Sequence, residues 1–289
     1  MIIKKIILIC FFAAFCSCQD YGELKKIGSL KTRSLAEISG IVTFKGDSLI
    51  YAIADHSNPN FIYGLDKTGE IQREIVVANA PNEDWEDLAS DDMGNLYISD
   101  TGNNENDRKD QFIYIIKDFK NSVKKTDTLT ASKIAFTLSD QKEYPPSLKE
   151  LNFDIEALIY KDNYLYMFTR NRSRNFNGLT KLYKLPAREG TYEAQLLDSY
   201  TVCDDINTCA ITGAALSPDG KIIILLTSDK ILKLTNFTGE QFFSGDVTNL
   251  PFGYRSSKEG VTFKDDSTLY IVDEIRAQTG GNIYEFKLN

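Results

Sequence analysis

The sequence predicts an all-β fold, and three observations support this prediction. Short apolar segments alternate with turns rich in Gly, Asp and Asn from Asp20 onward. No stretch keeps a helical period for long, and one pattern of residues recurs along the chain. Strands separated by such turns are typical of sandwiches, barrels and propellers. The recurrence favours a propeller, because propellers are built from repeated units of four strands.

The recurring unit has a polar residue, a small residue or Asp, an apolar strand, a tight turn and a second apolar strand. Its copies read EISGIVTFKGDSLIYAIAD, DWEDLASDDMGNLYISD, DIEALIYKDNYLYMFTR, AITGAALSPDGKIIILLTSD and SKEGVTFKDDSTLYIVDE. One column of this alignment holds Ser39, Glu86, Glu156, Thr212 and Glu259. The next column holds Gly40, Asp87, Ala157, Gly213 and Gly260.

Two more strand-like pieces follow each copy except the last, which is followed only by NIYEFKLN. The segment GELKKIGSL near the start of the chain can supply the missing strand. An N-terminal strand that completes the last blade closes the ring and removes open sheet edges. We therefore predict a five-bladed β-propeller of four-stranded blades, with the last blade closed by the N-terminal strand.

A six-bladed propeller is the alternative. Successive residues of the first column are 47, 70, 56 and 47 positions apart, and the longest step could contain a degenerate blade around NSVKKTDTLTASKIAFTLSDQKEYPP. Two full blades in that step would be short against the usual ~40–45 residues per blade. The spacing therefore favours five blades.

The first residues are typical of a secretory signal. Lys4 and Lys5 precede an apolar run over residues 6–15, which is too short for a permanent transmembrane helix. Cys18 follows Ser17 as in a bacterial lipoprotein box, so we predict a lipoprotein signal peptide at 1–17, lipid on Cys18, and one propeller domain over 18–289. Cleavage by the general signal peptidase is the alternative. The predicted location is the cell envelope, lipid-anchored and extracytoplasmic, facing the periplasm or the cell surface.

Charge and cysteine content narrow the range of partners. Without Lys4 and Lys5 the chain has 31 basic and 41 acidic residues, a net charge of −10, which argues against nucleic-acid binding. Cys203 and Cys209 in VCDDINTC predict a local disulfide in an oxidising compartment, and a metal-binding pair is the weaker alternative. The sequence contains no P-loop and no dinucleotide fingerprint, so we expect no nucleotide cofactor.

Loop length predicts which end of the propeller binds ligands. In each blade the first strand begins on the face where the second strand ends, and the connections HSNPN, TGNNENDRKDQ, NRSRNFNGLT and EIRAQTGGN lie on that face. We call it the long-loop face. Elaborated loops on a rigid scaffold are common binding sites. The residues that we assign to ligand binding there are Asp55, His56, Glu86, Asp87, Asp100, Asn103, Arg108, Arg170, Arg172, Arg255, Asp273 and Glu274.

Carboxylates near the axis make a metal site a candidate. Glu86, Glu156 and Glu259 offer oxygen ligands of the kind that calcium prefers, and planar guanidinium groups around them suit carboxylates or phosphates. The structural alternative is that these carboxylates bind backbone groups and neutralise the arginines. His56, the only histidine, is a candidate base or metal ligand, but we favour a loop histidine that is hydrogen-bonded to Asp55. Trp85 is expected to pack between blades.

The blocks EISGIV, DWEDLASDDMGNLYISDTGNNENDR, DIEALIY and EGVTF with LYIVDE resemble secreted bacterial β-propellers related to the SdiA-regulated proteins. More distantly they are similar to the phytase-like esterase and senescence-marker/gluconolactonase propellers. The resemblance extends from about Glu37 to Glu274. In the gluconolactonase-like proteins Glu, Asn and Asp hold a divalent cation near the axis, which implies candidate roles for Glu86, Glu156 and Glu259. Ser39 and Thr212 depart from that ligand pattern.

Three functions follow as hypotheses. The first is a lipid-anchored propeller that binds a small anionic or oligomeric ligand on the long-loop face, with calcium as the candidate ion. The second is a metal-dependent hydrolase of esters, lactones or phosphoesters, in which the cation polarises the substrate or activates water. The third is a protein-interaction platform for an envelope protein. The fold by itself does not choose among them.

Overall fold

The structure, a computed structural model, describes residues 19–277 and 279–288. The predicted signal peptide at 1–17 and the predicted lipidation site Cys18 lie outside the described residues. Within the described ranges, every helix is too short or too polar to cross a membrane.

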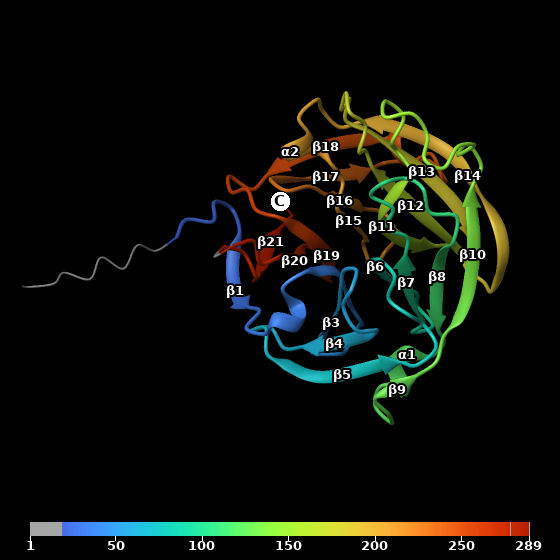
Figure 1. Ribbon diagram of the computed structural model, residues 1–289. Coiled ribbons are helices and arrows are strands. Elements are labelled where there is room, and N and C mark those ends of the chain that lie inside the picture. Colours follow the sequence, from blue (N-terminus) through green and yellow to red (C-terminus); the bar gives the residue numbers. More distant parts are fainter. Residues whose placement is uncertain (1–18, 278, 289) are drawn as a thin grey trace, which may run out of the picture.

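The regular secondary structure of the described chain is almost entirely β, which confirms the predicted all-β class. Its helices are short: α1 (Phe119–Ser122) and α2 (Ile206–Cys209) have four residues each, and the 3-10 turns η1 (Arg33–Leu35) and η2 (Phe242–Ser244) have three. Figure 1 shows the sheets arranged around a common centre.

Four sheets contain the strands. The first has the order β2 (Ile38–Thr43), β3 (Ile50–Ala54), β4 (Phe61–Leu65), β5 (Ile71–Val77), β9 (Thr128–Leu129). The eight-stranded second sheet has the order β11 (Asp154–Lys161), β12 (Tyr164–Arg170), β13 (Leu179–Pro186), β14 (Gly190–Thr201), β10 (Ser132–Leu138), β8 (Gln111–Ile116), β7 (Leu96–Asp100), β6 (Trp85–Ser90). Its two halves are joined by a parallel pairing of β10 with β14.

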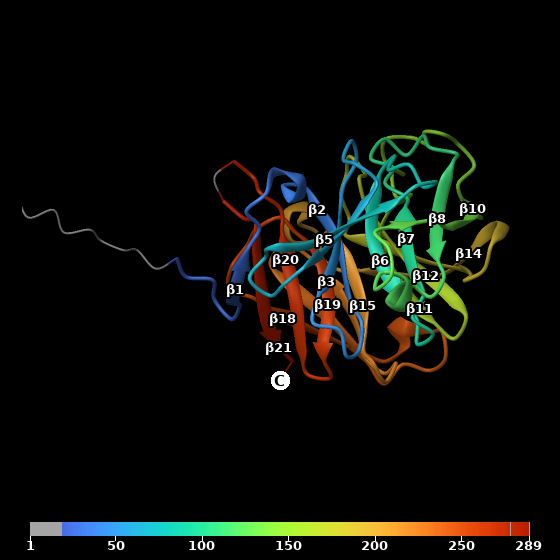
Figure 2. The same cartoon turned by 90° about the horizontal axis from the view of Figure 1, so that it is seen from below.

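The third sheet has the order β15 (Gly213–Leu216), β16 (Ile223–Leu226), β17 (Lys230–Thr235), β18 (Asp246–Pro251). The fourth has the order β1 (Lys25–Ser29), β21 (Asn282–Lys287), β20 (Thr268–Asp273), β19 (Lys258–Asp265). Figure 2 shows β1 beside β21, so segments from the two ends of the described chain share one sheet. This pairing covers an edge that the C-terminal strands would otherwise leave open.

The first strands of the repeat units line the centre of the molecule. β2 contacts β6, β6 contacts β11, β11 contacts β15, β15 contacts β19, and β19 contacts β2. Four of these strands carry a β-bulge at the first repeat column, at Ser39, Glu86, Glu156 and Glu259. A bulge adds a residue to one strand and redirects its side chain. The repeat column is therefore a structural feature of the inner strands.

Side-chain hydroxyl groups on or beside the inner strands link one repeat unit to the next. Ser39 Oγ donates to the Trp85 carbonyl oxygen at 2.8 Å, and Thr212 Oγ1 donates to the Lys258 carbonyl oxygen at 2.7 Å. Thr101 Oγ1 donates to the Ile155 carbonyl oxygen at 2.8 Å. Each acceptor lies one residue before a glutamate of the repeat column. The departures at Ser39 and Thr212 therefore have a structural reason.

The 70-residue step has an unusual course. It contains α1, the two-residue strand β9 that pairs with β5, the strand β10 that pairs with β8, and a connection over 139–153. The segment in which a degenerate blade was the alternative therefore forms no sheet of its own. Its strand β9 joins the first sheet and its strand β10 joins the second. Trp85 is fully buried beside Leu88 and Tyr114, as expected for a packing residue.

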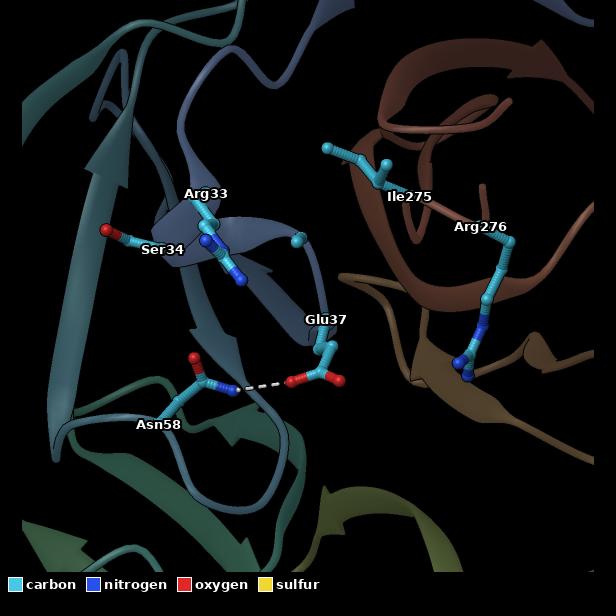
Figure 3. Close-up of a pocket in the computed structure, with 7 residues that line it drawn as sticks. Arg33, Ser34, Glu37, Asn58, Ile275 and Arg276 are labelled. Atoms are coloured by element: carbon cyan, nitrogen blue, oxygen red, sulfur yellow. Dashed lines mark hydrogen bonds between the residues drawn. The ribbon is translucent and has the colours of Figure 1, made fainter. Parts of the chain in front are cut away.

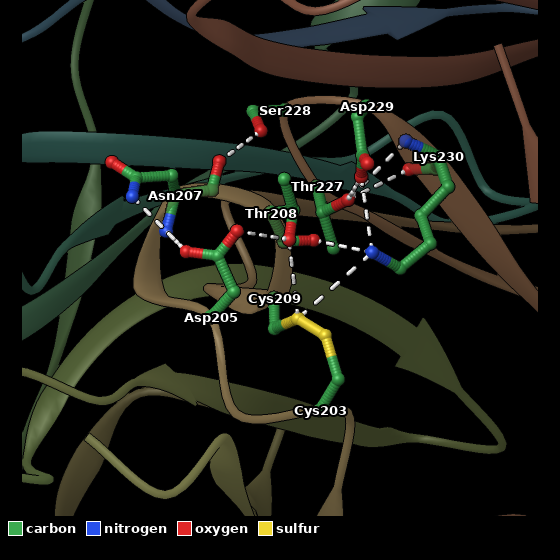
Figure 4. The surroundings of a disulfide bond; sticks show 9 residues. All are labelled: Cys203, Asp205, Asn207, Thr208, Cys209, Thr227, Ser228, Asp229 and Lys230. Atoms are coloured by element: carbon green, nitrogen blue, oxygen red, sulfur yellow. Dashed lines mark hydrogen bonds and ion pairs between the residues drawn. A yellow bond between two sulfur atoms is a disulfide. The ribbon is translucent and has the colours of Figure 1, made fainter. Parts of the chain in front are cut away.

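Cys203 and Cys209 form the predicted disulfide. Figure 4 shows it beside Lys230, whose ammonium group donates to the Thr208 carbonyl oxygen. Ser228 Oγ also donates to the Asn207 carbonyl oxygen, so the cystine loop is attached to the start of β17.

Replacing both cysteines by serine is expected to lower the free energy of unfolding by about 2 kcal/mol, because the bridge closes a short loop in the unfolded chain. Chemical denaturation of the variant and of the oxidised wild type measures this difference. Dithiothreitol should lower the wild-type value and leave the variant unchanged. Equal stability of the two proteins would contradict the prediction.

Candidate functional site

The long-loop face carries the connections 55–60, 101–110, 171–178 and 274–281. The hairpin turns at the opposite end include 91–95, 162–163 and 266–267. The connections 101–110, 171–178 and 274–281 are longer than the turns that join first and second strands at the opposite end, whereas 55–60 is no longer than the turn 44–49. The connections 117–127 and 236–245 at the opposite end are as long, so loop length does not by itself separate the two faces. The connections 202–212 and 252–257 also reach this face, because they lead into inner strands that begin there.

Seven carboxyl groups gather where the inner strands begin. Their mutual electrostatic effects link them into one group, which we call the axial acidic cluster: Asp55, Asp84, Glu86, Asp154, Glu156, Glu259 and Glu274. Asp84 and Asp154 stand two residues before the repeat-column residues Glu86 and Glu156. Because side chains alternate along a strand, residues two apart point to the same side.

The tightest part of the cluster is formed by Glu86, Asp154 and Glu156. Carboxylate oxygens of these three buried residues all lie within 4.8 Å of one another. The sequence analysis proposed Glu86, Glu156 and Glu259 as metal ligands and missed Asp154. Glu259 lies on the other side of Arg170, whose Nη1 is 3.1 Å from Glu156 Oε2 and 3.7 Å from Glu259 Oε2.

Two arginines from β12 and the loop after it neutralise part of this charge. Arg172 Nε donates to Asp154 Oδ2 and its Nη2 donates to Glu156 Oε1, both at 2.6 Å. Arg170 Nη1 donates to Glu156 Oε2 at 3.1 Å. A planar fork suits such paired contacts with carboxylates. Asp154 and Glu156 are therefore well satisfied.

Glu86 and Asp84 lack the arginine contacts that Asp154 and Glu156 have. The Glu86 side chain is 7% exposed, and its carboxylate has neither a hydrogen bond nor an ion pair among residues 19–277 and 279–288. A Cβ at Gly102 would lie 2.2 Å from both Glu86 Oε1 and Asp84 Oδ2, so these two oxygens converge on a place that only glycine leaves open. Asp84 Oδ1 is buried and also lacks a hydrogen-bond partner.

A second group lies toward the surface. Asp55, His56 and Asp84 each offer an atom within 4.8 Å of the others, and His56 is exposed while both aspartates are half-buried. Asp55 Oδ1 accepts the backbone N–H of His56. Asp84 belongs to both groups, since it also adjoins Glu86 at Gly102.

Burial and mutual repulsion raise the pKa values of these carboxyl groups. Burial, reinforced by the Asp55 carboxyl, raises the pKa of Asp84 to about 8. Burial raises the pKa of Glu156 to about 8 against the attraction of Arg170, and the pKa of Glu259 to about 7. Burial raises the pKa of Glu274 to about 7. Burial and the neighbouring Glu156 hold the pKa of Glu86 well above its usual range.

Asp87 and Asp273 have structural contacts. Asp87 is fully buried, and its carboxylate accepts the backbone N–H groups of Leu88, Leu158 and Ala214. Asp273 is fully buried as well, and accepts from Asn282 N at 2.7 Å and from Tyr284 Oη at 2.8 Å.

The loop after β7 is braced by its own polar residues. Arg108 Nη2 donates to Asp100 Oδ1 at 3.2 Å and its Nη1 donates to the Gly102 carbonyl oxygen at 2.8 Å. The Asn103 backbone N–H donates to Asp154 Oδ1 at 2.6 Å. These contacts position Gly102 against the cluster. Arg255 is exposed in the connection 252–257 and does not belong to the axial acidic cluster. Its positive charge acts on Asp205.

No protein-family model and no curated protein sequence matches this chain. The resemblance to SdiA-regulated proteins therefore stays a prediction. Solved structures do match. The PQQ-bound form of aldose sugar dehydrogenase from Streptomyces coelicolor has a TM-score of 0.50 and 11% identity, covering 91% of this chain and 96% of that one. A glucose dehydrogenase has a TM-score of 0.51 and 9% identity, covering 92% and 99%. At these identities the similarity shows the fold alone, that of β-propeller proteins.

Proposed function

We propose that this protein is a lipid-anchored, extracytoplasmic five-bladed propeller that binds a small anionic ligand on its long-loop face, with calcium held by the axial acidic cluster. The observation that carries the proposal is the buried carboxylate of Glu86, which has no hydrogen-bond or ion-pair partner in the described chain. The closed sequence of contacts among β2, β6, β11, β15 and β19 supports five blades.

The donor atoms fit a hard cation. Glu86, Asp154 and Glu156 offer only oxygen, and calcium takes six to eight oxygen ligands in flexible geometry. Zinc and other softer metals prefer nitrogen and sulfur donors, which the group lacks. Glu86 and Asp84 would supply the free oxygens, while Asp154 and Glu156 keep their arginine contacts.

Charge balance supports the same proposal. Seven carboxyl groups of the cluster face four guanidinium groups: Arg170, Arg172 and Arg276 form ion pairs with them and Arg108 attracts Asp84, which leaves an excess of three carboxyl groups. Uncompensated carboxylates at this depth cannot all stay ionised. Protons or a cation must balance them, and a divalent cation would replace protons whose pKa values are raised to about 7 and 8.

A metal-dependent hydrolase is the second candidate, favoured by the position of Asp55, His56 and Asp84 between the buried group and the surface. A bound cation would supply Lewis acidity there, and Asp84, with its raised pKa, would hold or accept a proton. Turnover of ester or phosphoester substrates that stops in chelator would support this candidate. The protein-interaction platform predicts binding of an envelope protein instead.

Thermal unfolding with chelator and then with calcium tests the proposal. Calcium is expected to raise the midpoint, because a ligand that binds only the folded state stabilises it; ~2.7 kcal/mol is expected at a hundredfold excess over Kd. Glu86→Gln should abolish the calcium-dependent rise. Glu193→Gln removes an exposed carboxylate from β14 and should leave it intact. No calcium effect on the wild type, or an equal effect on Glu86→Gln, would refute the metal site.

A further inference from the structure

A cavity of about 500 Å³ opens on the long-loop face between η1 and the connection 274–281. Figure 3 shows Arg33, Glu37 and Asn58 on one side of it and Ile275 and Arg276 on the other. Its volume is within the range of small-molecule sites, ~300–1,000 Å³. The cavity is distinct from the buried group of Glu86, Asp154 and Glu156, none of which lines it.

Backbone contacts hold the two sides of the cavity at a fixed separation. Ile275 N donates to the Ala36 carbonyl oxygen at 2.8 Å, which ties the fourth sheet's loop to the segment before β2. On the other side, Asn58 Nδ2 donates to Glu37 Oε2 at 3.2 Å and to the Asp55 carbonyl oxygen at 3.0 Å. The backbone of the two sides is thus linked, and Arg33, Glu37 and Arg276 present exposed side chains to the cavity.

The charges of the lining are unequal. Arg33 is exposed, and within the described part of the chain its guanidinium has no hydrogen bond or ion pair. Arg276 Nη2 lies 2.6 Å from Glu274 Oε2, which leaves its other donors available. Glu37 contributes one negative charge, and its carboxylate accepts a hydrogen bond from Asn58 Nδ2. Arg276 is already paired with Glu274 just outside the lining, so Arg33 is the guanidinium group of the cavity that has no ion-pair partner among the described residues.

Guanidinium groups and a carboxylate in one cavity select for two features in a ligand. The planar forks of Arg33 and Arg276 recognise an oxyanion, and Glu37 accepts a hydrogen bond from a donor close to that oxyanion. An anion without a donor would meet Glu37 as a like charge. The apolar part of the lining consists of Ala36 and Ile275 and is small, so the ligand must be mainly polar.

We infer that this cavity binds a small hydroxylated oxyanion, with its carboxylate or phosphate on Arg33 and Arg276 and a hydroxyl group on Glu37. The inference rests on the proposed function, since it names the class of anionic ligand that the long-loop face takes. Glu274 connects the two sites, because it pairs with Arg276 and belongs to the axial acidic cluster.

Calorimetric titration of the full protein in chelator with D-glycerate, glycerol 3-phosphate and glycerol tests the inference. Binding of either anion without binding of glycerol is expected, and the pair distinguishes a carboxylate ligand from a phosphate ester. Arg33→Gln should weaken that binding at least tenfold. Arg276→Gln should do the same if it unfolds at the wild-type temperature. Arg188→Gln, which changes an exposed arginine between β13 and β14 at the opposite end, should have no effect.

Two outcomes would overturn the inference: neither anion binds, or the anion binds Arg33→Gln as tightly as the wild type. Calcium-dependent unfolding separates these outcomes from failure of the proposed function. Arg33→Gln should keep the calcium response, and Glu86→Gln should lose it while still binding the anion in chelator. If the calcium response is intact and no anion binds, only the assignment of the cavity as an anion site is refuted.

Discussion

Replacing Asp87 by alanine is expected to lower the free energy of unfolding by about 3–5 kcal/mol. The Asp87 carboxylate accepts backbone N–H groups from three inner strands, through Leu88 on β6, Leu158 on β11 and Ala214 on β15. Each buried donor left without a partner costs ~1–3 kcal/mol. Alanine also leaves a void at a fully buried position. The melting temperature should fall by about 10 °C, at ~2–4 °C per kcal/mol in a domain of this size.

Asp87→Asn separates the lost hydrogen bonds from the lost charge. Asparagine keeps the volume and one acceptor oxygen, so it should retain part of the contacts and cost roughly half as much. Asp92→Ala changes an exposed aspartate in the turn 91–95 and should be nearly neutral. Urea unfolding of all three variants gives the comparison. A loss below about 1 kcal/mol in Asp87→Ala would show that Asp87 does not hold the inner strands together.

The second large effect is a loss of stability of the metal-free protein as the pH rises from about 5 to 8. The pKa values of Asp84 and Glu156 are raised to about 8, and those of Glu259 and Glu274 to about 7. In the unfolded chain these groups titrate near 4. Between the unfolded-state pKa values and the folded-state pKa values, the folded state holds more protons than the unfolded state. The free energy of unfolding therefore falls with rising pH, by ~1.4 kcal/mol per pH unit for each extra proton.

Thermal unfolding in chelator at pH 5.5 and pH 8 measures this effect, and the midpoint should be several degrees lower at pH 8. Calcium should reduce the difference, because the cation replaces protons that the cluster otherwise needs. Glu86→Gln should raise the midpoint at pH 8 in chelator, since it removes one uncompensated charge. A midpoint in chelator that is equal or higher at pH 8 would contradict the assigned pKa shifts. Lys258, with a pKa lowered by burial to about 8, acts in the opposite direction only above that pH.

A trade-off between stability and binding follows from these expectations. Glu86→Gln should make the metal-free protein more stable and remove its calcium response. Strained, uncompensated groups are common at functional sites, where their cost is retained for binding. If Glu86 were only structural, its replacement would instead destabilise the protein.

Local patterns in the sequence were enough to predict most strands. Alternating apolar residues around short turns such as DMGN and KDDS identified the strand pairs, because side-chain alternation and turn chemistry act over a few residues. The repeat column placed Glu86, Glu156 and Glu259 on inner strands, where the structure has them. Asp154 was equally visible, two residues before Glu156 and therefore on the same side of its strand.

Only the tertiary structure decided which of these residues act together. Asp87 and Glu86 are neighbours in the sequence, yet the bulge in β6 directs one into backbone contacts across the centre and leaves the other unpaired. Arg170 bridges Glu156 and Glu259, and Arg33 and Arg276 line one cavity although they lie far apart in the chain. The sequence alone determined the all-β class and the strand pairs. Partner choice and burial depended on contacts between distant blades, which no local pattern encodes.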